Sequence, residues 1–295
     1  MNKTYRYDDA FKAKARAHQF EYKESVLKDD YAEKNPQVML SEQSARQGLI
    51  FCEEYRDLIL EKGDFKAFGT SALFSNMLRS EHIPYNIFTP MEEDRDNAAA
   101  LFNEIIGDGI AKIIDIKIEF AGDGDKAEYL NDGTSFDAFV RYERVDGGVG
   151  GIGIEVKYTE NAYRLGKKEG EDIVKLEGNK YRQMTEKSNY FIPSLDIKVF
   201  LKAHHLRQIW RNHLLGFAML DKGEIQTFHH VHLYPEGNTH FYEHALPEYC
   251  KILTEEGRES FIGLTYEKLF DLLPRFFQSA KQMKWVQYLN ERYMI

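Results

Sequence analysis

Glu155 and Lys157 stand two residues apart in the segment GIGIEVKYT, in which apolar residues recur at every second position. Residues two apart in a strand point to the same face, so this pair shares one face while Ile154 and Val156 share the other. The preceding segment SFDAFVRYE also alternates like a strand, and a hairpin between the two segments would bring Asp137 beside Glu155. Neighbouring carboxylates repel each other unless they share a proton or a cation. The three residues therefore indicate a metal site with a lysine at its edge.

The chemistry that this trio could perform is hydrolysis. Few oxygen ligands, with coordination positions left for water, suit Mg²⁺, and Mn²⁺ is the alternative ion. Asp137 and Glu155 are the predicted metal ligands and catalytic carboxylates, and Lys157 would position or deprotonate water or stabilise charge on a phosphoryl group.

The bare spacing is not specific, because an acidic residue stands two positions before a lysine five times in the chain. Only Glu155 combines a strand of its own with an aspartate on the strand before it. The structural alternative, an exposed salt bridge between Glu155 and Lys157 on a strand face, stays open at this point.

The elements that must position the trio follow from periodicity. Residues 110–120, 135–143 and 151–159 are predicted strands, joined by Gly- and Asp-rich connectors short enough for antiparallel pairing. Helices are expected in residues 7–62, broken at Pro36, then from about 70 to 82, and from 91 to 106. After the strands come helices near 173–187 and 201–220, a strand in QTFHHVHLYP, a strand near 260–264 and two final helices.

The expected fold is α/β, a mixed central sheet flanked by helices. Residues 1–68 are expected to form a helical N-terminal extension and residues 69–295 one compact α/β domain.

The order helix, strand, strand with Asp137, strand with Glu155 and Lys157, helix, strand resembles the restriction-endonuclease-like fold of the PD-(D/E)XK nuclease superfamily. The resemblance covers about residues 71–234, with Phe136 where the family name has proline. It implies that Asp137 and Glu155 bind the metal, that Lys157 assists the water, and that a Glu from the helix before the first strand joins them. Glu81 is the candidate for this last role. The segment HLRQIWRNHLLG is similar to a subset of bacterial nuclease-like proteins of unassigned role.

A nucleic-acid-binding face is predicted around residues 198–215, which contain no acidic residue although the chain carries a net charge of −9. On a helix, one side of this segment would be polar and the other apolar. With residues upstream, the polar side could contact the phosphate backbone of a nucleic acid, and DNA is the expected substrate. The candidate contacts are Lys180, Gln183, Arg207, Gln208, Arg211 and Asn212. The alternative is a solvated helix face whose arginines pair with neighbouring acids.

The histidines of FHHVHLYPEGNTHFYEH raise another class of function. His230 and His232 share one strand face, and His240 and His244 are a helical turn apart, as in some zinc or iron sites. A histidine-based metal-binding protein is therefore one alternative to the nuclease. A catalytically inactive nuclease fold that binds nucleic acid or a protein is the other.

The composition bears on the class of protein and on its compartment. The acidic balance argues against a protein that coats nucleic acid indiscriminately, and no segment approaches the roughly 20 apolar residues that cross a bilayer. Cys52 and Cys250 fit two thiols in a reducing compartment, so a cytoplasmic protein without a membrane partner is expected. The oligomeric state is open, with a homodimer as one option.

Overall fold

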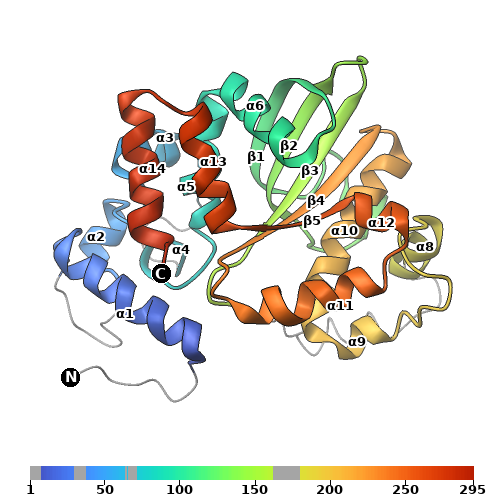
Figure 1. Ribbon diagram of the computed structural model, residues 1–295, viewed down its shortest axis with the longest axis horizontal. Coiled ribbons are helices and arrows are strands. Elements are labelled where there is room, and N and C mark those ends of the chain that lie inside the picture. The colour runs from blue at the N-terminus through green and yellow to red at the C-terminus, as the bar shows by residue number, and fades with distance from the viewer. Residues whose placement is uncertain (1–7, 30–37, 64, 66–71, 162–179) are drawn as a thin grey trace.

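The computed structural model describes residues 8–29, 38–63, 65, 72–161 and 180–295, and its centre is a five-stranded sheet (Figure 1). In spatial order the strands are β1 (Ile110–Phe120), β2 (Phe136–Arg144), β3 (Val149–Val156), β4 (Thr227–Tyr234) and β5 (Phe261–Thr265). Strands β1, β2 and β3 are antiparallel neighbours, whereas β3, β4 and β5 run parallel. The predicted α/β fold with a mixed sheet, flanking helices and a helical N-terminal segment is confirmed.

Helices precede, interrupt and follow the sheet. Those before it are α1 (Ala10–Ser25), α2 (Glu42–Arg46), α3 (Arg56–Lys62), α4 (Ala72–Ser75), α5 (Ile83–Glu93) and α6 (Arg95–Ile106). Those between β3 and β4 are α8 (Lys180–Lys187), α9 (Val199–Lys202) and α10 (His204–Lys222). Around and after β5 lie α11 (Leu246–Lys251), α12 (Glu255–Glu259), α13 (Tyr266–Phe276) and α14 (Ala280–Tyr293). Short helical turns are η1 (Glu53–Tyr55), η2 (Lys126–Glu128) and η3 (His240–Ala245). None of these described helices has the length and apolar composition needed to cross a membrane.

Two hydrophobic cores cover the two faces of the sheet. Helices α5, α6 and α13 pack on one face and α14 packs on α5 and α13. Ile152, Ile154 and Val156 of β3 contribute to this first core. Helix α10 packs against β3 and β4 on the other face, in the second core (Figure 1). Strand β3 is buried on both faces, as expected of a strand covered by helices on two sides. The first core also includes side chains of α1, and the division at residue 68 stays a prediction.

The glycines of β3 let aromatic rings lie directly on this strand. An added Cβ at Gly153 would overlap the Phe136 ring, and one at Gly151 would lie 2.5 Å from the ring of Phe139. Contacts this close require a residue without a side chain. Gly151 and Gly153 therefore allow the aromatic rings of β2 to pack directly on β3.

The helix boundaries expected on either side of Pro84 are wrong. Helix α4 ends at Ser75 instead of continuing to about residue 82, and α5 begins at Ile83 with Pro84 in its first turn. Proline fits there because the first amides of a helix have no partner within it. The expected helix of residues 91–106 is divided, because the Asp94 side chain accepts a hydrogen bond from the Asn97 amide and caps α6. Part of the helix expected near 173–187 lies outside the described residues.

Candidate active site

Asp137 on β2 and Glu155 on β3 lie side by side in the sheet. The antiparallel register pairs Ala138 with Ile154, so the next positions toward the open end of the hairpin are Asp137 and Glu155. The Val156 amide donates a hydrogen bond of 2.6 Å to Oδ2 of Asp137. Both carboxylates line a cavity of about 380 Å³, and Lys157 lines it with them. The structure therefore brings together the three residues singled out from the sequence.

Helix α10 holds the Glu155 carboxylate in place. Glu155 is only 1% exposed, and Lys157 donates to its Oε1. Gln208 donates to the same oxygen and Asn212 donates to Oε2. Gln208 and Asn212 are four residues apart on α10 and thus point to one side of the helix. A buried carboxylate that accepts from three donors is fixed in orientation.

The cavity holds two carboxyl groups, Asp137 and Glu155, and the single ammonium group of Lys157. Burial raises the pKa of Asp137 well above its usual range and Glu155 raises it further, although Lys157 and the Val156 amide act in the opposite direction. Burial by itself would lower the pKa of Lys157, but Glu155 and Asp137 outweigh this effect and the pKa is raised. Lys157 is therefore a cation at neutral pH, and its single charge leaves repulsion between the two carboxylates.

This donor set fits a divalent cation. Carboxylate oxygens are the ligands that Mg²⁺ prefers, and Mg²⁺ is commonly held by one or two carboxylates with water at its remaining positions. Burial and the neighbouring Glu155 carboxylate both raise the pKa of Asp137, and a bound cation would offset both effects. Asp137 and Glu155 are the residues that would hold it. Within the described residues, no three His, Cys, Asp or Glu side chains are grouped as ligands of one ion.

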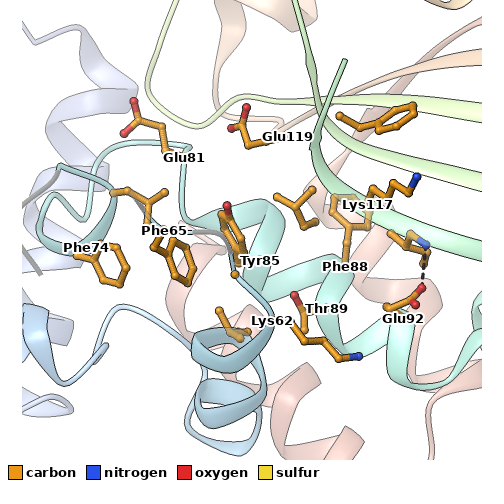
Figure 2. Close-up of a pocket in the computed structure, with 16 residues that line it drawn as sticks. Lys62, Phe65, Phe74, Glu81, Tyr85, Phe88, Thr89, Glu92, Lys117 and Glu119 are labelled. Atoms are coloured by element: carbon orange, nitrogen blue, oxygen red, sulfur yellow. Dashed lines mark hydrogen bonds between the residues drawn. The ribbon is translucent and has the colours of Figure 1, made fainter. Parts of the chain in front are cut away.

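Glu81 lines the same cavity, but it lies in a turn and not on the expected helix. It lies in the turn before α5 instead of on a helix, forms an ion pair with Arg79, and lines the cavity beside Lys157. Its place on a helix is therefore a wrong expectation, because the helix begins only at Ile83. Glu81 also lines a second, larger cavity of about 1030 Å³, and Figure 2 shows it together with Glu119 on one side of that cavity.

Glu119 is a carboxylate that the sequence analysis did not single out. Its neighbours Ile118 and Phe120 pair with Ala138 and Phe136, so Glu119 stands opposite Asp137. Partial burial raises the pKa of Glu119, and Glu155 and Glu81 raise it further. Its backbone has a φ of 54°, a strained conformation for a residue with a side chain. Counting strand register back from Asp137 is the signal that could have identified it.

The polar side of α10 faces the interior, which corrects the expected solvent-facing stripe. Arg207 is fully buried and donates to the Phe200 carbonyl oxygen. Arg211 is 8% exposed, forms a 2.9 Å ion pair with Asp132, and donates to the hydroxyl groups of Thr134 and Tyr181. The alternative of a solvated face with arginines paired to acids is met only in part, because Arg211 pairs with Asp132 but neither arginine lies on a solvated face.

The other candidates for nucleic-acid contact have different surroundings. Gln208 lines the 380 Å³ cavity, whereas Asn212 is 1% exposed and is engaged with Glu155. On α8, Lys180 is half-buried and Gln183 is exposed. Among the six candidates, only Lys180, Gln183 and Gln208 thus have side chains that are not buried.

Two of the three histidines of β4 are buried, and the third, His229, is half-buried. His230 and His232 have no exposed surface, and none of their ring nitrogens has a hydrogen-bond partner among the described residues. His240 is half-buried on η3 and His244 is exposed. His232 lines the cavity of Asp137 and Glu155.

The sequence model of the PD-(D/E)XK nuclease superfamily matches residues 6–295, nearly the whole chain. The chain therefore belongs to this superfamily, as its mixed sheet and the carboxylate pair on the β2–β3 hairpin indicate. No curated protein and no solved structure gives a significant match.

Proposed function

We propose that the protein is a nuclease that hydrolyses phosphodiester bonds in DNA with Mg²⁺ or Mn²⁺. The observation that carries the proposal is the convergence of Asp137, Glu155 and Lys157 on one cavity, in a chain of a nuclease superfamily. A bound divalent ion supplies a Lewis acid and lowers the pKa of water.

The residues of the chain have separate tasks in this proposal. Asp137 and Glu155 bind the ion, and Gln208 and Asn212 keep the Glu155 carboxylate oriented. The Lys157 ammonium, a cation because of its two acidic neighbours, positions the attacking water and stabilises charge that develops on the phosphoryl oxygens. Glu81, at the edge of the same cavity, adds a carboxylate that orients water.

The substrate approaches from the open side of the cavity, where Lys180 and Gln183 on α8 and Gln208 on α10 are the proposed contacts to the phosphate backbone. A cytoplasmic location fits the two free cysteines, Cys52 and Cys250, which form no disulfide. A homodimer is one arrangement in which two such sites would cut both strands.

The test is cleavage of a panel of substrates, namely supercoiled plasmid, linear duplex, single-stranded DNA and RNA, with Mg²⁺, with Mn²⁺ and with a chelator. We expect cleavage of DNA that requires the ion and is lost in Asp137→Asn, whose side chain retains the shape but not the charge. Cleavage of RNA alone would show that the substrate is RNA and not DNA. Nucleic acid that is bound but never cut would support the inactive-fold alternative.

A further inference from the structure

His232 is a buried polar residue at the site to which the proposed mechanism gives no task. It pairs in register with Glu155 on β3 and with Gly263 on β5, so its side chain stands beside Glu155 on the same face of the sheet. The Phe241 ring covers it at a centroid distance of 4.7 Å. His232 thus forms part of the floor of the cavity that Lys157 and Glu155 line.

Neither ring nitrogen of His232 has a hydrogen-bond partner among the described residues. A buried polar atom without a partner destabilises a protein, so such groups usually have a partner in some state of the protein. Burial, followed by the charges of His230, Lys157 and His240, lowers the pKa of His232 well below its usual range. The imidazole is therefore neutral, with one donor nitrogen and one acceptor nitrogen.

His230 is a useful comparison, because it is as buried as His232 but lies outside the cavity. It is equally buried, also lacks partners, and stands two residues earlier on β4. Its ring, however, stacks on Phe261 at 5.4 Å and lies 5.9 Å from the ring of His213, and it is not among the residues that line the cavity. Only His232 combines the unpartnered nitrogens with a place beside Lys157.

The Glu155 carboxylate is crowded with donors. Oε1 accepts from both Lys157 and Gln208, which uses both of its lone pairs, and Oε2 accepts from Asn212. A divalent cation on this carboxylate competes for these lone pairs and repels the ammonium group. Lys157 then needs another acceptor, and a buried ammonium group without one would be costly.

We propose that His232 is a positioning residue for Lys157: a ring nitrogen of His232 accepts a hydrogen bond from the Lys157 ammonium group when a divalent cation occupies Glu155. The inference rests on the proposed function only in requiring that the ion binds. It does not require that any nucleic acid is cut. In the metal-bound state His232 would hold the ammonium group toward the cavity and away from the metal ligands.

Nuclear magnetic resonance of the ring nitrogens tests this directly. The full-length protein is labelled with ¹⁵N-histidine, titrated with Mg²⁺ alone, and the His232 signals are assigned by their absence in His232→Gln. We expect the acceptor nitrogen of His232 to shift as Mg²⁺ binds, while the His230 signals stay in place. In Lys157→Met, which keeps an unbranched stem but lacks the terminal ammonium donor, the shift should be absent although Mg²⁺ still binds.

Each outcome decides the inference. Mg²⁺ binding with an unmoved His232 signal, or with the same shift in Lys157→Met, would overturn it and leave the proposed nuclease intact. Failure to bind Mg²⁺ and Mn²⁺ would overturn both. A Lys157-dependent shift in a protein that cuts no substrate would support the inference and contradict the proposed function.

Kinetics supply the second readout. His232→Phe should lower kcat by about tenfold or more with little change in KM, because a hydrogen bond to a charged group is lost. His232→Gln, which keeps an acceptor, should restore most of the rate, and the matched control His230→Phe should cut at the parent rate. Equal losses in the two phenylalanine variants would assign both histidines to packing and overturn the inference.

Discussion

Replacing Asp137 by asparagine should stabilise the metal-free protein. The ionised Asp137 carboxylate is partly buried beside Glu155, and these two causes raise its pKa well above the usual range. Asparagine removes the charge and still offers an oxygen to the Val156 amide, which donates to Asp137 in the parent. The variant therefore loses the repulsion and retains the hydrogen bond.

The magnitude follows from the linkage between pKa and stability. One pKa unit corresponds to about 1.4 kcal/mol, and solvent in the cavity screens part of the repulsion, so we expect a gain of about 1–2 kcal/mol at pH 7. For a chain of this length that is a rise in Tm of roughly 2–4 °C. Below about pH 3 the carboxyl group is protonated in both the folded and the unfolded parent, so the difference should vanish there. It should grow as the pH rises through the folded-state pKa, because only the parent loses stability in that window.

Urea unfolding at several pH values measures this difference, without metal and with Mg²⁺. Saturating ion should reverse the order, because binding at 100 times Kd stabilises the parent by about 2.7 kcal/mol and the variant lacks a ligand. The control is Asp146→Asn on the β2–β3 turn. The Gly148 amide and Arg144 lower the pKa of Asp146, so that variant should show no gain. A variant at position 137 that is less stable than the parent at every pH without metal would refute the reasoning.

Three further substitutions test separate parts of the structure. Lys157→Ala should leave the Mn²⁺ affinity measured by calorimetry nearly unchanged, because Lys157 is not a proposed metal ligand. The cleavage rate should fall by about 10²- to 10⁴-fold. A variant that cuts at the parent rate would show that Lys157 has no part in the mechanism. Arg211→Ala should lower the free energy of unfolding by about 2–3 kcal/mol, because the buried pair with Asp132 is lost. The salt dependence of DNA binding should not change. A weaker salt dependence in this variant would show that Arg211 contacts the DNA backbone. Gly216→Ala should destabilise α10 in urea unfolding although alanine favours helices, because its Cβ would overlap the Phe228 ring; a more stable variant would show that this ring can move.

The strands and the pairing of Asp137 with Glu155 could be predicted from the sequence because they follow from local rules. Alternation of apolar residues located β1, β2 and β3, and the short connectors implied antiparallel pairing, so Asp137 and Glu155 had to be neighbours. The partners of Glu155 on α10 could not be predicted in the same way. Gln208 and Asn212 looked like an exposed polar face because periodicity separates polar from apolar sides but does not show which buried polar groups the polar side meets.

Carboxylates at the ends of elements were harder to place. The position of Glu81 was linked to a helix that ends at Ser75, since Pro84 suggested a stop where it in fact begins the next helix. Glu119 was missed because its place opposite Asp137 depends on tertiary register and on a backbone conformation that side chains rarely adopt.

A crystal structure of the protein with Mn²⁺, whose anomalous scattering locates the ion, would show directly whether Asp137 and Glu155 bind the metal. We expect a single strong peak bonded to both carboxylates, absent in Asp137→Asn crystals treated in the same way. A peak at the histidines of β4 and η3 with none between the two carboxylates would contradict it.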